Sequence, residues 1–353
     1  MNNFDTERTT VTVERKKTHR VHPLIKRLVN RIGVGGTLYQ GYVETLRLGE
    51  RAQNLWRTPD PGATILLAGS GRSGTTWLTE TLTYKTGVQA IFEPMIPLWN
   101  REVRYLTGWD DSDPHIRSFY LRAEAHDPAW RALLWRILAG QYRNYWTEKE
   151  RTAFFPKRLL VKEIRMNLML GYVYKHFQPT ILYLVRHPCA VVASRLHAAW
   201  HADVQDILRQ EALVEDYLRP WVREIEQERD PVGAHAVWWA VENFIAIRQL
   251  ARIPHLMVTY EEIALFPELQ AQRILAYVDL PIPEGLCRRM EQPSITTSAA
   301  SGRSTQSRLS AWQRYFAQDD QRRILSWAQR MGLQMYSEAV LPVGMRAPMV
   351  DAT

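Results

Sequence analysis

A glycine- and serine-rich loop that carries one cation is the stretch with the clearest chemistry. The loop reads GSGRSGTTW, follows the apolar run Thr64–Ala68 and precedes a helix-compatible segment. Glycines permit tight turns, and the amides of such a loop converge on an anion at the N-terminus of the next helix. Gly69 and Gly74 have the spacing of half a Walker motif, but Thr75 stands where an NTPase needs its lysine. Arg72 instead places a cation inside the loop, which predicts an anion site and argues against ATP or GTP hydrolysis.

A second basic motif begins about 115 residues further along the chain. The apolar run Thr180–Val185 ends at Arg186, and Pro188 begins a helical segment that carries Ser194. An arginine at the carboxyl end of a parallel strand lies at the edge where ligands bind such sheets. The helix that follows offers its N-terminus and a hydroxyl to the same anion, and a planar guanidinium suits phosphate. We therefore expect Arg186 and Ser194 to bind a second anionic group.

Strands and helices that alternate along the chain must position these motifs. Buried strands are predicted at 64–68, 159–164, 180–185 and 256–259, and helices at 74–85, 188–199 and 266–277. This alternation predicts an α/β fold with a central, mainly parallel sheet flanked by helices. Two further regions, 97–150 and 200–252, are helical and hold most of the 13 tryptophans. We expect these Trp-rich insertions to form a ligand-binding side of the fold, with one or two indole rings lining a pocket.

The positive charge is concentrated near the start of the chain. The formal net charge is +8, and residues 1–58 hold 11 Lys and Arg against 5 Asp and Glu. A nucleic-acid-binding protein would carry its basic residues along a working face of the fold, so no nucleic-acid partner is expected. We predict a partly helical or flexible basic leader at 1–58, a catalytic domain at 59–340 and a tail at 341–353. The leader is expected to be solvated, with weak contact to an acidic membrane surface as the alternative.

The remaining composition is that of an ordinary globular protein. Hydrophobic residues make up 46% and charged residues 23% of the 353 residues, and no apolar run is long enough to span a membrane. The first twenty residues have no apolar core of a signal peptide. Cys189 and Cys287 are too few for a disulfide framework, so we expect free thiols and a cytoplasmic location.

The phosphate loop resembles the 5′-phosphosulfate loop of sulfotransferases that use 3′-phosphoadenosine 5′-phosphosulfate (PAPS). That family's pattern, (K/R)-S-G-T-T-(W/F), is matched at every position by Arg72, Ser73, Gly74, Thr75, Thr76 and Trp77. The resemblance implies that the loop amides and threonines hold the 5′-phosphate, that Arg72 meets the bridging oxygen, and that Trp77 stacks on adenine. PAPS would be the co-substrate and PAP, the desulfated nucleotide, the product.

The second motif is similar to the same family's 3′-phosphate motif, R-(D/N)-P-x-x-x-x-x-S, at Arg186 and Ser194. His187 departs from the usual Asp or Asn. Tyr260-Glu261-Glu262 looks like the family's strand end, and the stretch 301–304 is similar to its late loop over the 3′-phosphate, where the resemblance implies a role for Arg303. The resemblance extends from about residue 63 to 335.

The predicted site has three candidates for the general base. The segment Phe92–Pro94 and the form of both motifs resemble the carbohydrate branch of the family, which implies a catalytic Glu93, although Glu93 would equally suit a turn cap. Lys162 matches a lysine that cytosolic sulfotransferases carry, but Ile164 stands where their catalytic histidine would be. Glu163 and His201 are the alternative bases.

The predicted reaction is in-line transfer of a sulfuryl group to a small-molecule or carbohydrate acceptor, with Arg72 and Lys162 stabilising the leaving phosphate. The acceptor is expected to be a sugar or glycoconjugate hydroxyl, with another alcohol, a phenol or a lipid head group as alternatives. No metal-binding motif is present, so no metal is expected. Two alternatives remain: a P-loop kinase or NTPase, and a PAP-binding relative without catalysis. The oligomeric state is left open.

Overall fold

The computed structural model describes residues 41, 45, 48, 58–109, 118–144, 146–150, 156–292 and 304–345. The chain divides into two units, Met1–Thr45 and Leu46–Thr353, and the fold described below is that of the second. The predicted leader therefore lies almost entirely outside the described residues.

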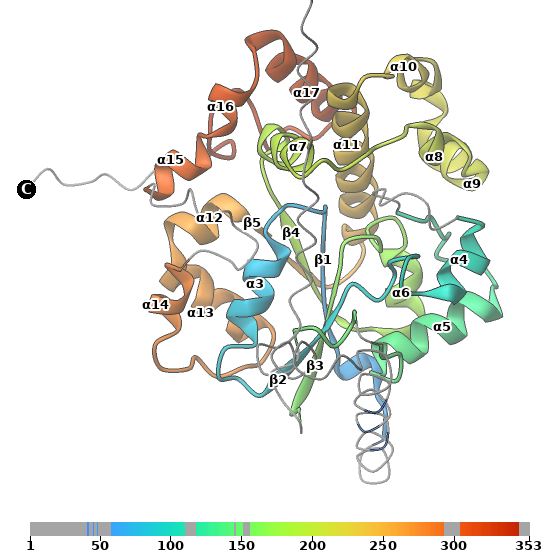
Figure 1. Cartoon of the computed structure of the whole chain (residues 1–353), viewed down its shortest axis with the longest axis vertical. Coiled ribbons are helices and arrows are strands. Elements are labelled where there is room, and N and C mark those ends of the chain that lie inside the picture. Colours follow the sequence, from blue (N-terminus) through green and yellow to red (C-terminus); the bar gives the residue numbers. More distant parts are fainter. Residues whose placement is uncertain are drawn as a thin grey trace, which may run out of the picture. The chain divides into compact units, whose positions relative to one another are not determined.

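A five-stranded parallel sheet forms the centre of this unit (Figure 1). Its strands are β1 (Ile65–Gly69), β2 (Val88–Phe92), β3 (Arg158–Glu163), β4 (Thr180–Val185) and β5 (His255–Thr259). Their order across the sheet is β2-β3-β1-β4-β5, which places β1 in the middle. Because all strands run in the same direction, the residues that follow each of them emerge at one edge of the sheet. That edge therefore collects the phosphate loop, Glu93, Arg186 and Tyr260.

The helices of the first half connect and flank the strands. They are α3 (Thr75–Leu82), α4 (Arg101–Thr107), α5 (Pro128–Leu138), α6 (Leu170–Phe177) and α7 (Pro188–His197), with a short 3-10 turn, η1 (Pro61–Ala63), before β1. Asp127 and Asn100 cap α5 and α4 with side-chain hydrogen bonds to first-turn amides.

The second half is mostly helical. Between β4 and β5 lie α8 (Gln205–Leu208), α9 (Glu211–Leu213), η2 (Val214–Leu218), η3 (Arg219–Trp221), α10 (Val222–Gln227) and the long α11 (Pro231–Leu250). After β5 come α12 (Tyr260–Leu265), α13 (Pro267–Tyr277), α14 (Leu286–Met290), α15 (Thr305–Leu309), α16 (Trp312–Tyr315) and α17 (Gln318–Arg330).

The sheet is buried on both faces because successive side chains of each strand point to opposite sides. Ile65 and Leu67 pack in a cluster with α3, α12, α13 and α14, whereas Leu66 and Ala68 pack in a larger cluster with α5, α6, α7, α11 and α17. Figure 1 shows these two groups of helices on opposite sides of the strands. Two-sided burial explains why the strands read as continuous apolar runs.

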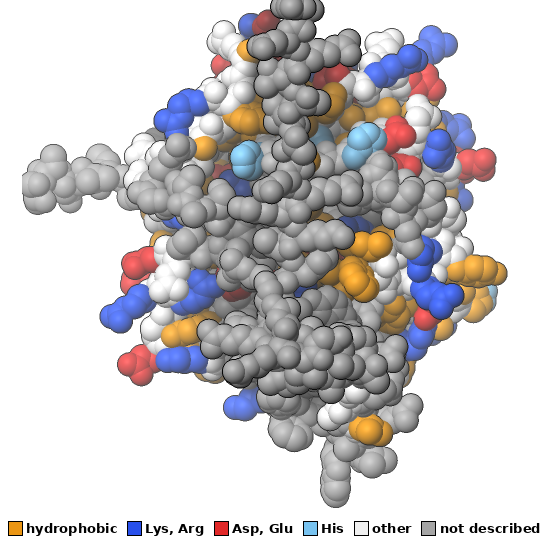
Figure 2. All heavy atoms as spheres, viewed as in Figure 1, with side chains coloured by type: hydrophobic (Ala, Val, Ile, Leu, Met, Phe, Trp, Pro, Cys, Tyr) orange, Lys and Arg blue, Asp and Glu red, His pale blue; other side chains and the backbone are white. Residues whose placement is uncertain are grey.

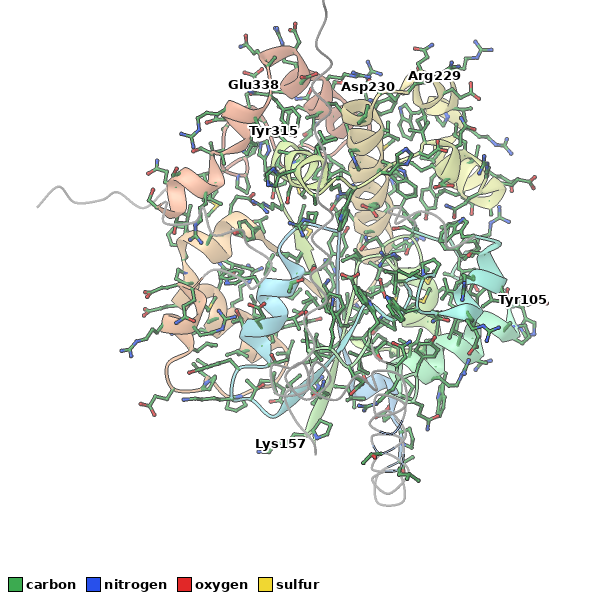
Figure 3. All side chains as sticks on the ribbon, viewed as in Figure 1. Tyr105, Lys157, Arg229, Asp230, Tyr315 and Glu338 are labelled. Atoms are coloured by element: carbon green, nitrogen blue, oxygen red, sulfur yellow. The ribbon has the colours of Figure 1, made fainter. Side chains whose placement is uncertain are left out.

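The predicted fold class is confirmed, and the four predicted strands lie within one residue of the observed ones. The predicted Trp-rich regions contain helices α4, α5 and α8–α11. Trp130, Trp238 and Trp239 are buried, whereas Trp99 and Trp135 are each 37% exposed. Tyr105 on α4 is 87% exposed and points outward at the periphery (Figure 3).

On the face in view in Figure 2, basic and acidic side chains are interspersed over the described part of the surface. Across the described ranges, no helix combines the length and hydrophobicity that crossing a bilayer requires.

Candidate active site

The phosphate loop is a strained turn between β1 and α3. Gly74, the residue before α3, has φ +101°, and a Cβ there would lie 2.5 Å from the ring of Tyr260. A Cβ on Gly69 would lie 2.4 Å from the carbonyl oxygen of Leu184 on β4. Arg72 also has a positive φ, of 77°. Glycine is therefore required at both of these close approaches, and the loop conformation is held by its neighbours.

The loop presents hydrogen-bond donors that nothing in the described protein uses. Gly74 caps α3 without a side-chain hydrogen bond, which leaves the first-turn amides of α3, including those of Thr75 and Thr76, available to an anion. The hydroxyl of Ser73 is buried and has no hydrogen-bond partner among the described residues. Because a buried polar group without a partner is costly, this hydroxyl fits a bound phosphate oxygen.

The two predicted anion motifs meet directly. The Nε atom of Arg72 donates to the Oγ atom of Ser194 at 3.1 Å, and a guanidinium nitrogen of Arg186 donates to the carbonyl oxygen of Arg72 at 3.2 Å. The guanidinium of Arg72 lies 5.7 Å from the ring centre of Trp200. Burial and the nearby charge of Arg186 lower the pKa of Arg72. The structure therefore joins segments 122 residues apart into one basic site.

Arg186 is oriented by the segment that follows β5. Its guanidinium lies 4.2 Å from the ring centre of Tyr260, and its Nε atom is buried with no partner in the described part of the chain. Glu261 accepts a hydrogen bond at 3.0 Å from the backbone N–H of His187 and another at 2.8 Å from the hydroxyl of Tyr336. The Tyr-Glu-Glu strand end thus supports the turn that carries Arg186.

His187 is a packing residue. Its ring stacks on Trp312 with a centroid separation of 4.2 Å, and its Nε2 atom lies 3.0 Å from the carbonyl oxygen of Ser337. Burial lowers the pKa of His187 to about 4. Burial, with Arg195 nearby, likewise lowers the pKa of His235 on α11 to about 3. Both imidazoles are therefore neutral in the folded protein near neutral pH.

These two histidines predict a loss of stability in mild acid. In the unfolded chain each imidazole takes up a proton near pH 6.5. In the folded chain His187 takes up its proton only near pH 4 and His235 only near pH 3. The stabilisation is therefore complete above pH 6.5 and is lost as the pH falls, by about 1.4 kcal/mol per pH unit for each histidine. Urea unfolding between pH 7 and 5 measures this effect. The free energy of unfolding of His187→Asn should fall less steeply with decreasing pH than that of the wild type. Equal slopes would contradict this assignment.

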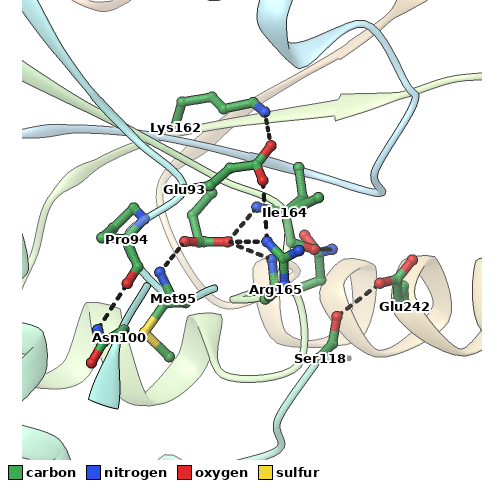
Figure 4. A network of polar contacts seen from close by, with 11 residues as sticks. Glu93, Pro94, Met95, Asn100, Ser118, Lys162, Ile164, Arg165 and Glu242 are labelled. Carbon is green, nitrogen blue, oxygen red and sulfur yellow. Dashed lines mark hydrogen bonds and ion pairs between the residues drawn. The ribbon is translucent and has the colours of Figure 1, made fainter. Parts of the chain in front are cut away.

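Glu93 lies at the centre of a buried charge cluster, which Figure 4 shows. One carboxylate oxygen pairs with the Nζ atom of Lys162, and the other lies 3.2 Å from a guanidinium nitrogen of Arg165. The backbone N–H of Glu93 also donates to the carbonyl oxygen of Lys162 at 2.8 Å. Burial opposes ionisation, but Lys162 and Arg165 outweigh it and hold the pKa of Glu93 at about 2.

Glu163 mainly contacts backbone groups, and one of its oxygens also lies 3.7 Å from a guanidinium nitrogen of Arg165. One of its oxygens accepts hydrogen bonds from the N–H groups of Ile164 at 2.8 Å and Arg165 at 3.0 Å, and the other accepts from Met95 at 2.7 Å (Figure 4). Burial raises the pKa of Glu163. This carboxylate ties together the chain segments that follow β2 and β3, and so positions Glu93 and Arg165.

The other predicted residues are placed as follows. Trp77 is 7% exposed, and its indole N–H donates to the carbonyl oxygen of Gln292 at 3.2 Å. His201 is exposed in the loop after α7. Arg303 lies outside the described residues. The described residues hold no cluster of three or more His, Cys, Asp or Glu arranged for a metal ion.

Sequence reasoning missed two charged residues near this cluster. Arg165 follows β3 by two residues and pairs with Glu93, and its spacing from Lys162 could have indicated a shared partner. Glu150 has one oxygen buried without a hydrogen-bond partner among the described residues, and burial raises its pKa to about 7. It precedes β3 in a region without a motif, so no signal in the sequence pointed to it.

A comparison with protein families identifies the family of this chain. Residues 64–284, well over half of the chain, match the model described as "Sulfotransferase family". The chain belongs to the sulfotransferase family. No curated protein sequence matches this sulfotransferase.

Solved structures similar to the sulfotransferase include three that carry the same family name. The sulfotransferase domain of the curacin biosynthetic pathway is 16% identical with a TM-score of 0.44, and the match covers 77% of this chain and 98% of that one. The domain from the Synechococcus PCC 7002 olefin synthase is 16% identical with a TM-score of 0.47, covering 79% and 97%. A mouse sulfotransferase complexed with PAP is 14% identical with a TM-score of 0.41, covering 80% and 88%.

Family membership confirms the expectation of a sulfotransferase enzyme, and PAPS is the sulfuryl donor predicted for it. The carbohydrate branch and the individual roles of the site residues stay predictions.

Proposed function

We propose that this sulfotransferase transfers a sulfuryl group from PAPS to a hydroxyl of a small-molecule or carbohydrate acceptor, and that Glu93 is its general base. The observation that carries the proposal is the meeting of two clusters at one edge of the sheet. The first holds Arg72, Arg186 and Ser194, and the second holds Glu93 with Lys162. The two are close enough for the charge of Glu93 to act on the pKa of Arg72. A positively charged site that binds anions, next to a buried carboxylate, suits the transfer of an anionic group to a hydroxyl.

Several residues that would hold the nucleotide have hydrogen-bond donors without a partner in the described structure. Ser73, Thr75, Thr76 and the loop amides bind the 5′-phosphate in this proposal. Arg186 and Ser194 bind the 3′-phosphate, with Arg303 added from the family resemblance and Trp77 beside adenine. The unpartnered buried atoms, Oγ of Ser73 and Nε of Arg186, fit phosphate oxygens.

PAPS, when bound, supplies the sulfuryl group, which passes in line to the acceptor oxygen as the bond from sulfur to the bridging phosphate oxygen breaks. Arg72 and Lys162 stabilise the negative charge that develops on that oxygen. Glu93 accepts the proton of the acceptor hydroxyl. The buried position of this cluster keeps water away from the charges and so strengthens their interaction.

The ion pair of Glu93 must rearrange for this role. With both Lys162 and Arg165 beside it, the pKa of Glu93 is about 2, which is too low for an efficient base near neutral pH. Movement of Lys162 toward the charge developing on the leaving oxygen would leave Glu93 with Arg165 and the charge of Lys149. Burial would then raise the pKa of Glu93, so in this proposal Lys162 links departure of the phosphate to proton acceptance.

The acceptor is proposed to be a sugar or glycoconjugate hydroxyl, on the resemblance to the carbohydrate branch, and the enzyme is proposed to act in the cytoplasm. Calorimetric titration with PAP and separately with Mg-ATP tests the donor, and transfer from labelled PAPS to sugars, phenols and other alcohols tests the acceptor. Preference for Mg-ATP would support a kinase instead. PAP binding without transfer to any acceptor class would support a non-catalytic relative.

Arg186→Ala is expected to weaken PAP binding by about 1.5–3 kcal/mol, because it removes charge-assisted hydrogen bonds to phosphate. The dissociation constant from calorimetry measures the effect. Arg209→Ala, which removes a guanidinium that is 73% exposed, is the matched control and should bind PAP as the wild type does. Unchanged affinity in Arg186→Ala would contradict the assignment of the 3′-phosphate site.

A further inference from the structure

A pair of polar residues stands in the middle of α11, a helix that is buried along most of its length. All residues from Gly233 to Ala246 in α11 are buried, and Glu242 and Asn243 lie within this stretch. A buried carboxylate is costly unless it is paired and hydrogen-bonded, so the partners of Glu242 indicate its role.

Glu242 binds the inner side of the phosphate loop. Its Oε2 atom accepts hydrogen bonds from the hydroxyl of Ser70 at 2.9 Å and from a guanidinium nitrogen of Arg195 at 2.9 Å. Arg195, next to Ser194 on α7, also donates from Nε to the carbonyl oxygen of Gly71 at 3.1 Å. Ser70, Arg195 and Glu242 are all fully buried. Two consecutive loop residues, Ser70 and Gly71, are therefore held on the side of the loop that faces α11. The contacts use a hydroxyl and a carbonyl oxygen, so the loop amides stay available to an anion.

The same face of α11 holds the second anion motif. Trp239 precedes Glu242 by three residues and Asn243 by four, so the three side chains share one face of the helix. The indole N–H of Trp239 donates to the carbonyl oxygen of Arg186 at 3.2 Å. The amide of Asn243 donates to the hydroxyl of Ser70 at 3.0 Å, and its oxygen accepts from the hydroxyl of Tyr183 on β4 at 3.1 Å.

We propose that Trp239, Glu242 and Asn243 are positioning residues that set the separation of the phosphate loop and the Arg186 strand end, and so match the site to the spacing of the two phosphates of PAP. This inference rests on the proposed function. A bisphosphorylated ligand requires two anion sites at a defined separation, and a rigid helix bonded to both provides it. None of the three side chains needs to touch the ligand.

The other oxygen of Glu242 supplies a matched control. Its Oε1 atom accepts a hydrogen bond from the buried hydroxyl of Ser118 at 2.7 Å, which Figure 4 shows, and Ser118 makes no hydrogen bond to either anion motif in the described structure. Ser70→Ala and Ser118→Ala therefore each remove one hydroxyl from the same carboxylate, but only Ser70→Ala removes a contact between that carboxylate and the loop.

The test measures PAP affinity by calorimetry, with thermal unfolding recorded for every variant. Ser70→Ala should weaken PAP binding about tenfold, and Glu242→Asp, which keeps the charge but withdraws the carboxylate, by a similar factor. The double variant Ser70→Ala/Glu242→Asp should weaken PAP binding by less than the two single effects combined, because both substitutions remove the contact between Ser70 and Glu242. Trp239→Phe, which keeps a ring and removes the donor to Arg186, should weaken binding about threefold. Ser118→Ala should lose a similar amount of stability to Ser70→Ala and bind PAP within twofold of the wild type.

Wild-type PAP affinity in Ser70→Ala, or equal weakening in Ser118→Ala, would overturn the inference while leaving the proposed function intact, provided that Arg186→Ala still weakens binding. A wild-type protein that does not bind PAP would overturn both. Since Ser70→Ala removes a single hydroxyl, it answers the question even if Glu242→Asp does not fold.

Discussion

Replacing Glu93 by glutamine is expected to lower turnover by about 10²–10⁴-fold, the usual contribution of a general base. Glutamine has nearly the same shape but does not accept the acceptor's proton. PAP affinity should not fall, because the substitution removes a negative charge from beside Lys162 and Arg165. Transfer from labelled PAPS at saturating donor measures turnover, and calorimetry measures PAP binding.

Other carboxylates provide the controls for this result. Glu102→Gln changes a glutamate on α4 that is 47% exposed and should leave turnover unchanged. Full activity in Glu93→Gln would refute its role as the base, and Glu150→Gln, Glu163→Gln and His201→Gln would then identify which alternative carries the function. If Glu93 is the base, Glu163→Gln should lose stability without a specific loss of turnover, since the Glu163 carboxylate holds three backbone amides.

The second large effect is on stability. Glu242→Leu should reduce the free energy of unfolding by about 3–5 kcal/mol, because it leaves the charge of Arg195 buried without its carboxylate partner. Both side chains are fully buried, so solvent cannot compensate. Urea unfolding at neutral pH measures the loss.

A double variant separates the charge imbalance from the loss of the pair itself. Arg195→Met combined with Glu242→Leu removes both charges and replaces them with apolar groups of similar volume, which can be neutral or stabilising. We expect this double variant to be more stable than Glu242→Leu alone. If it is less stable, then the hydrogen bonds to Ser70, Ser118 and Gly71, and not the unpaired charge, determine the cost.

Much of the fold could be predicted from the sequence because the signals are local. Thr180–Val185 reads as a buried strand because both faces of a parallel sheet are covered, and Pro188 begins a helix because its fixed φ suits the first turn. The phosphate loop follows from glycines at Gly69 and Gly74, where a side chain would strike a neighbouring strand or Tyr260. The structure of such motifs is determined by a few neighbouring residues. One sequence was therefore sufficient to predict the loop, the strand end at Arg186 and the family.

Contacts between distant segments were decided by the tertiary structure alone. The sequence placed Glu93, Lys162 and Glu163 near strand ends, but only the sheet order β2-β3-β1 brings Glu93 against Lys162 and Arg165 and turns Glu163 toward the backbone. Likewise, Glu242 reads in the sequence as a polar residue in an apolar helix, and only packing shows that it binds Ser70, 172 residues away. Which buried charges pair depends on how the helices pack on the sheet. Local propensity does not determine that packing, so the sequence alone did not predict these pairs.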